Sequence, residues 1–221
     1  MKKIRLLFQG DSITDAGRNR ENPHDLGNGY PRFAAKYILE KYNDIDFDFI
    51  NLGISGNNTA DLVERLQKDF LDIHADIISI LIGINDCWRN IEKDTFITND
   101  VFELHYRTVL ESIREKTNAK IMILEPFFIP VYNRLSYSAS SDENYEILFA
   151  KDLAPKIEII RKLAREYADV YLPTDGLLQS AFIDNDPCVF SEDGVHPNEK
   201  GAEYIGKLYF QYISELIDRL V

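Results

Sequence analysis

Five short runs of the chain are almost continuously apolar and rich in β-branched and aromatic residues. Runs of this kind suit strands that are buried on both faces of a parallel sheet. The strands predicted from them are residues 4–8, 47–53, 76–83, 120–127 and 169–173.

Between these runs, apolar residues recur at intervals of three and four, which is the period of an amphipathic helix. Asn58 and Thr59 precede the second of these patterns and could cap its first turn. The five patterns are marked by Phe33, Tyr37 and Ile38; by Leu62, Leu66 and Phe70; by Phe102, Tyr106, Val109, Leu110 and Ile113; by Ile157, Ile160, Ala164 and Tyr167; and by Ile205, Tyr209, Tyr212, Leu216 and Leu220.

The alternation of strand and helix predicts an α/β fold with right-handed crossovers. We expect a three-layer α/β/α sandwich around a five-stranded parallel sheet, of flavodoxin-like type. No linker rich in Pro, Gly or Ser divides the chain, so residues 1–221 are expected to form one domain. The irregular stretch 128–150 is expected to be a loop, either a lid over a site or an interface.

The composition disfavours some classes of binding partner and some cellular locations. The chain has 25 Lys and Arg against 37 Asp and Glu, a formal net charge of -12. Such a charge disfavours nucleic acid and anionic membrane surfaces as partners. The apolar stretch near the start is too short for an export signal, and no run is long enough to span a membrane. With only Cys87 and Cys188, the sequence indicates a reducing, cytoplasmic setting.

Four segments combine the residue types that ester cleavage needs: GDSIT at 10–14, NLGISGNN at 51–58, GINDCW at 83–88 and DGVHP at 193–197. The first three follow predicted strands, and the carboxyl ends of parallel strands meet at one edge of a sheet. Ser12 can supply a nucleophile, His196 a base and Asp193 a carboxylate that orients the base. Gly53 and Asn85 can supply donors to an oxyanion.

Each residue also has a simpler explanation. Ser12 could be a helix N-cap, Gly53 and Asn85 could be turn residues, and Asp193 with His196 could be a surface ion pair. The combination of all four segments favours the catalytic interpretation. Cys87 lies beside the Asn85 segment, and we expect a packed thiol there rather than a reactive one.

The four segments resemble the blocks of the SGNH hydrolase superfamily, also called GDSL esterases, in the same order and with comparable gaps from residue 10 to residue 197. The resemblance implies a catalytic triad of Ser12, Asp193 and His196, without cofactor or metal. It also implies an oxyanion hole made by the N–H groups of Ser12 and Gly53 and the side-chain amide of Asn85. The first block reads Ser12-Ile13-Thr14 instead of ending in leucine, a variation that does not touch the nucleophile.

The substrate class is suggested by a finer resemblance. GDSITDAGR and GINDCWR are similar to the corresponding blocks of small intracellular carbohydrate acetylesterases, including acetylxylan esterases. We therefore expect removal of short acyl groups, acetyl above all, from saccharides such as xylo-oligosaccharides. The candidate substrate-binding residues are Asp11, Arg18, Tyr30, Trp88 and Tyr132, with Arg89, Tyr137 and Tyr145 as weaker candidates.

Several alternatives stay open. An acyl-CoA thioesterase or a lysophospholipase or lipase would use the same serine chemistry. A metal-dependent phosphoesterase could use Asp11, Asp15, Asn85, Asp86, Asp193 and His196 as ligands, but the chain lacks the other blocks of that class. A non-catalytic flavodoxin-like binding module shares the sheet. The long last helix could mediate homo-oligomer formation, and its pattern does not decide this.

Overall fold

The protein is described by a computed structural model, in which residues 3–92, 96–131 and 145–221 are described. Its five strands are β1 (Lys3–Gly10), β2 (Asp46–Asn51), β3 (Ile77–Leu81), β4 (Lys120–Leu124) and β5 (Val170–Leu172). They form one sheet of order β2-β1-β3-β4-β5, and every pairing is parallel. This is the strand order of flavodoxin-like folds, so the predicted fold class is confirmed.

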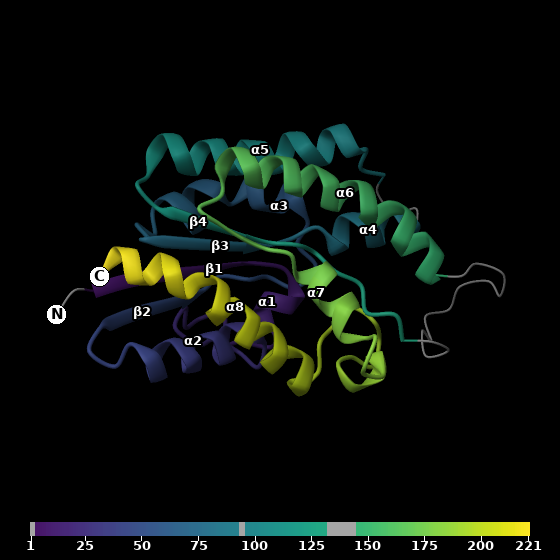
Figure 1. Cartoon of the computed structure of the whole chain (residues 1–221). Helices are drawn as coiled ribbons and strands as arrows, with labels where there is room; N and C mark the ends of the chain where they lie inside the picture. Colours follow the sequence, from purple (N-terminus) through teal and green to yellow (C-terminus); the bar gives the residue numbers. More distant parts are fainter. Residues whose placement is uncertain (1–2, 93–95, 132–144) are drawn as a thin grey trace.

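Helices cover both faces of the sheet (Figure 1). On one face lie α3 (Thr59–Glu64), α5 (Asn99–Lys116) and α6 (Tyr145–Tyr167), and on the other lie α2 (Tyr30–Lys41) and α8 (Glu199–Leu220). Each face has its own buried apolar cluster, one containing Phe70, Phe102 and Ile160 and the other Phe8, Ile38 and Tyr209. The remaining helices are α1 (Ser12–Asp15), α4 (Ile84–Ile91) and α7 (Thr174–Ala181), with a π-helical turn at Gln67–Leu71 and a 3₁₀ turn at Pro187–Val189.

The second predicted helix is not continuous. Asn58 caps α3 by accepting a hydrogen bond from the N–H of Asp61, as expected, but α3 ends before Arg65 and a π-helical turn follows. The break coincides with the inward path of the Arg65 side chain, which donates to the carbonyls of Leu52 and Gly10. The interrupted helix thus ties together the carboxyl ends of two strands.

The predicted loop 128–150 is only partly a loop. Helix α6 begins at Tyr145, so residues 145–150 are helical. Phe149 and Leu153 are buried and, with Ile157, continue the apolar spacing of the helix toward its start. Residues 132–144, including the candidates Tyr132 and Tyr137, lie outside the described residues, and so does the side chain of Tyr145.

Candidate active site

Ser12 is the first residue of α1, directly after the carboxyl end of β1. Gly10 lets this junction form, because a Cβ there would lie 2.3 Å from both the carbonyl oxygen of Leu81 and Oγ1 of Thr14. No side chain larger than hydrogen fits such a contact. The nucleophile candidate is therefore fixed at the edge where the strands end.

The loop before α8 brings a histidine to this serine. Ser12 Oγ lies 2.8 Å from His196 Nε2, and His196 Nδ1 lies 2.7 Å from Asp193 Oδ2. Ser12 and His196 are 184 positions apart in the chain. Nδ1–H can donate to the carboxylate while Nε2 accepts the serine proton, so the arrangement is able to relay a proton away from Ser12.

The loop that carries Asp193 and His196 is held by its own hydrogen bonds. Asp193 Oδ1 accepts from the backbone N–H groups of Val195 and His196, at 3.0 and 2.8 Å. Gly194 has φ of +85°, a left-handed conformation that glycine adopts without strain. Ser191 Oγ donates to the carbonyl of His196 at 2.8 Å. The relay is thus built into one rigid turn.

This turn sets the charges of the pair. Burial opposes ionisation of Asp193, but hydrogen bonds from the His196 ring and from backbone N–H groups outweigh it and hold its pKa well below the ordinary value. The hydrogen bond to Asp193 raises the pKa of His196, against a smaller opposing effect of burial. The carboxylate is therefore ionised throughout the neutral range and stabilises a protonated imidazole.

Asp11 does not face the solvent edge. Its side chain is 1% exposed and caps α1, with Oδ1 accepting from the N–H of Ile13 at 2.9 Å. Burial raises the pKa of Asp11 to about 7, although the Ile13 N–H and the charge of His196 oppose the rise. The expectation that Asp11 contacts substrate is therefore replaced by a buried capping carboxyl group whose charge acts on His196.

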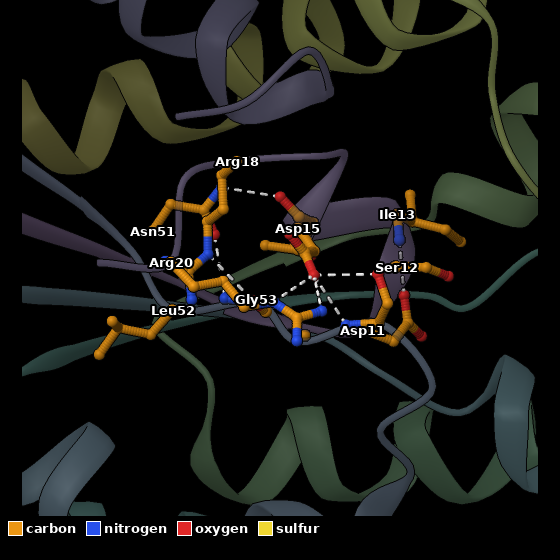
Figure 2. Close-up of polar contacts among 12 residues, drawn as sticks. Asp11, Ser12, Ile13, Asp15, Arg18, Arg20, Asn51, Leu52 and Gly53 are labelled. Atoms are coloured by element: carbon orange, nitrogen blue, oxygen red, sulfur yellow. Dashed lines mark hydrogen bonds and ion pairs between the residues drawn. The ribbon is translucent and has the colours of Figure 1, made fainter. Parts of the chain in front are cut away.

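The backbone N–H of Gly53 already has a hydrogen-bond acceptor within the protein. Its N–H donates to Oδ1 of Asn51 at 3.0 Å, and a Cβ at Gly53 would lie 2.6 Å from the backbone N of Asp15. Figure 2 shows this strand end packed beside the α1 segment. The N–H predicted to face an oxyanion is thus already bound, and the glycine is needed because β2 and α1 approach so closely.

A second glycine of the same segment is open. Gly56 is exposed, has φ of +84° and has no atom within 4 Å of the place where a Cβ would be. Within the described residues, the N–H groups of Gly56 and Ser12 have no hydrogen-bond acceptor. Asn85, in the first turn of α4, donates one amide hydrogen to the carbonyl of Asn57 at 2.8 Å, which leaves its second amide hydrogen unused. Gly56 was not predicted from the sequence. The feature that could have indicated it is its position directly before Asn57, whose carbonyl accepts from Asn85.

Asp86 fastens the two segments that carry these donors. It is fully buried and accepts from Thr59 Oγ1 at 2.6 Å and from the Thr59 N–H at 3.2 Å. Burial raises the pKa of Asp86 to about 6, although the bonds from Thr59 oppose the rise. The starts of α3 and α4 are thus joined by a buried carboxylate next to Asn85.

Arg18 lies beneath the site rather than on its rim. It is 7% exposed, and its Nε donates to the carbonyl of Gly53 at 3.0 Å. Asp15 is buried nearby and accepts from Arg20 (Figure 2). It also accepts from both the N–H and the hydroxyl of Ser55. These contacts fix the loop after β2 to the α1 segment, so Arg18 supports the site from beneath and does not lie on its rim.

The aromatic candidates have separate positions. Tyr30 is 1% exposed and packs on Phe8 and Tyr209, with one edge lining a small hollow beside Ser12. Trp88 is half-buried and its ring lies 5.4 Å from that of Phe149 in α6. Cys87 is fully buried, and burial raises the pKa of its thiol well above the ordinary value, as a packed thiol requires.

Two adjoining hollows open on the His196 side of Ser12. The first, about 100 Å³, is lined by Ser12, Ile13, Ala16, Gly29, Tyr30, His196, Pro197 and Ala202. The second, about 440 Å³, is lined by Ala16, Asn28, Arg32, Pro197, Asn198 and Glu199. Because Ala16 and Pro197 line both, the two hollows are neighbours.

The carboxylates considered as metal ligands each have a protein partner: Asp11 with Ile13, Asp15 with Arg20, Asp86 with Thr59 and Asp193 with His196. In the part of the chain that the structure describes, no three His, Cys, Asp or Glu side chains form a group that could hold a metal ion. Over the same residues, no helix is both long and apolar enough to cross a bilayer.

Comparison with known proteins gives consistent matches over nearly the whole chain. The profile of the GDSL-like lipase/acylhydrolase family matches residues 8–204. An acetylxylan esterase of Geobacillus stearothermophilus is 26% identical over 216 residues, which cover 95% of this chain and 93% of that protein. A GDSL-like protein from Parabacteroides merdae has a crystal structure with a TM-score of 0.86 and 30% identity, over 95% of each chain.

The structure of Axe2, an acetylxylan esterase from Geobacillus stearothermophilus, matches with a TM-score of 0.80 and 25% identity, over 94% of this chain and 93% of that one. Solved structures of three catalytic mutants of Axe2, altered at a serine, an aspartate and a histidine, also match. Their identities are 24–25% and their TM-scores 0.82–0.84, over 96% of this chain and 94–95% of theirs.

Proposed function

Because the chain belongs to the GDSL-like lipase/acylhydrolase family and is a carboxylic ester hydrolase, we propose that it removes short acyl groups, acetyl above all, from saccharides. The observation that carries the chemistry is the continuous contact from Ser12 Oγ to His196 and from His196 to Asp193, at 2.8 and 2.7 Å. The saccharide is supported by the likeness to acetylxylan esterases over nearly the full chain.

The proposed reaction has two halves. Ser12 Oγ attacks the ester carbonyl while His196 Nε2 takes its proton, and the Asp193 carboxylate stabilises the imidazolium. His196 then gives the proton to the departing alcohol, which leaves an acyl group on Ser12. His196 next takes a proton from a water molecule that attacks the acyl-serine. It gives this proton to Ser12 Oγ as the carboxylic acid leaves, which restores the free serine.

The oxyanion needs donors that have no other acceptor. We assign this role to the N–H of Ser12, the free amide hydrogen of Asn85 and the N–H of Gly56, in place of Gly53. An exposed glycine with open space around it also allows a substrate to approach the backbone closely. Losing one such donor typically lowers kcat by about a hundred- to a thousandfold.

The test is acetate release from acetylated xylo-oligosaccharides, other acetylated sugars and acetyl-CoA, with Ser12→Ala as the control. We expect serine-dependent release from the sugars, and a steep fall in rate from p-nitrophenyl acetate to the octanoate. Turnover of acyl-CoA or long-chain esters in preference to sugars would assign the chain to thioesterases or lipases. Full activity of Ser12→Ala or His196→Ala on p-nitrophenyl acetate would overturn the proposed triad.

A further inference from the structure

The direction of proton transfer divides the site into two sides. The oxyanion donors proposed here lie on the loops before α3 and α4, whereas the leaving oxygen must receive its proton from His196 Nε2. The alcohol part of the ester therefore lies on the His196 side of Ser12. Both neighbouring hollows described above are on that side, because His196 or its neighbour Pro197 lines each of them.

The two hollows differ in size and lining. The first, about 100 Å³, is small and mostly apolar, and it shares Ala16 and Pro197 with the second. The second, about 440 Å³, lies within the usual range of small-molecule sites, about 300–1,000 Å³. We call the second one the alcohol-side groove, and it is defined by Ala16, Asn28, Arg32, Pro197, Asn198 and Glu199.

Most polar side chains of this groove are available to a ligand, because they form few hydrogen bonds or ion pairs within the protein. Arg32 is exposed, lies 5.6 Å from the ring centre of Phe33 and makes only a long 3.5 Å contact with Asn28 Oδ1. Within the described residues, neither Arg32 nor Glu199 has an ion-pair partner. Asn198, in contrast, uses both side-chain atoms, because it caps α8 and donates to the carbonyl of Val189.

The backbone that carries these groups is fixed before any ligand arrives. The N–H of Asn28 donates to the carbonyl of Ala16 at 3.0 Å, and Gly27, at φ of +66°, donates to Asp25 at 3.0 Å. Glu199 begins α8 next to its cap, Asn198. The backbone around the open groove is therefore in place before a ligand binds, while the exposed side chains of Arg32 and Glu199 are free to turn toward it.

We propose that the alcohol-side groove binds the saccharide that leaves with the ester oxygen, with Asn28 and Arg32 donating to its hydroxyl groups and Glu199 accepting from them. A ring with several hydroxyl groups needs both donors and acceptors, which this groove offers. A fatty chain would find only Ala16 and Pro197 as apolar lining, and a phosphate group would face Glu199 on a protein of net charge -12. This inference rests on the proposed function.

The experiment compares two acetyl esters with different alcohols: acetylated xylobiose, whose sugar carries further hydroxyl groups, and p-nitrophenyl acetate, whose leaving group has no hydroxyl besides the ester oxygen. The variants are Arg32→Ala, Asn28→Ala and Glu199→Gln, and the matched control is Arg165→Ala, an exposed arginine on α6. We expect kcat/KM for the sugar ester to fall about tenfold or more in Arg32→Ala and Glu199→Gln. Turnover of p-nitrophenyl acetate should stay within about twofold of the wild type, and Arg165→Ala should change neither.

A binding measurement accompanies the kinetics. Unacetylated xylobiose should inhibit wild-type hydrolysis of p-nitrophenyl acetate competitively, and it should inhibit Arg32→Ala more weakly. Melting temperatures will show whether each variant is folded. We expect all of them to fold, because the substituted residues are exposed.

The outcomes separate the groove from the proposed function. If the wild type hydrolyses both esters and the variants lose neither or lose both equally, the groove assignment is wrong and the esterase function stands. If the wild type hydrolyses p-nitrophenyl acetate but no acetylated sugar, the saccharide substrate is wrong and the groove assignment falls with it. A selective loss on the sugar ester supports both.

Discussion

At the scale of single residues, the site depends on which backbone N–H groups already have an acceptor. The segment NLGISGNN contains two glycines, and the resemblance to SGNH hydrolases pointed to Gly53, which ends the predicted strand. In the structure the Gly53 N–H is bound by Asn51, whereas Gly56 is open. The order of residues shows where a glycine stands but not the direction of its N–H, which is set by the turn that follows.

Other residues at this scale lie where their positions in the four segments led us to expect them. Asp193 and His196, three positions apart, do meet within one turn, and Ser12 does lie at the end of β1. Burial was the property that the sequence could not reveal. Asp11 and Arg18 were expected to contact substrate, Arg18 because of the resemblance to carbohydrate acetylesterases, yet both are buried, since each finds a backbone partner beneath the site.

The first prediction at this scale concerns pH. The base must be neutral to accept the serine proton, and contact with Asp193 raises the pKa of His196. Activity on p-nitrophenyl acetate should therefore rise with pH, with its midpoint above the ordinary histidine value of about 6.5. Asp193→Asn should move this midpoint to lower pH and lower the plateau of kcat by about three to four orders of magnitude, as in serine proteases.

The control for this profile is Ser12→Ala measured over the same pH range, which subtracts uncatalysed hydrolysis. A midpoint in Asp193→Asn equal to or above that of the wild type would contradict the assigned contact.

At the scale of elements, the site is assembled from the starts of α1, α3, α4 and α8, each at the carboxyl edge of the sheet. The sequence predicted the strands well, because apolar runs buried on both faces are easily recognised. It did not predict α4 and α7, whose eight residues each are too few for a clear helical period. The interrupted α3 was also missed, since its apolar spacing continues through the π-helical turn.

The link between α3 and α4 gives the second prediction. Asp86→Asn should lower kcat about ten- to a hundredfold with little change in KM, because the amide keeps only one acceptor oxygen for Thr59 and fixes the loops of the proposed oxyanion donors less firmly. Thr59→Val should have a smaller effect in the same direction. The matched control is Thr98→Val, which removes the cap of α5 and should lower stability but not kcat. Equal loss of stability in all three with unchanged kcat would refute a positioning role for Asp86.

At the scale of the whole molecule, α8 docks on α2 with little space between them. A Cβ at Gly206 would lie 2.5 Å from Cβ of Phe33 and 3.0 Å from the backbone N of Ala34. Because the turn with His196 leads directly into α8, the docking of this helix also positions the catalytic base. The packing of α8 on α2 therefore affects both the stability of the protein and the geometry of the site.

The third prediction tests this connection. Gly206→Ala should destabilise the protein by about 1–3 kcal/mol, because the helices must separate or the methyl group must clash. Thermal unfolding should show a lower Tm, by about 2–4 °C for each kcal/mol. The matched control, Gly176→Ala in α7, meets no atom within 4 Å and should stabilise by up to about 1 kcal/mol. An unchanged or higher Tm in Gly206→Ala would show that the packing adapts freely.

The 184-residue separation between Ser12 and His196 has a consequence for protein synthesis. Domains begin to fold while the chain is still being made, starting from the N-terminal side. The nucleophile and the first strands are present early, but the base is added only after β5 and α7. A ribosome that stalls anywhere between the two codons therefore releases a polypeptide with an intact serine and no means of activating it.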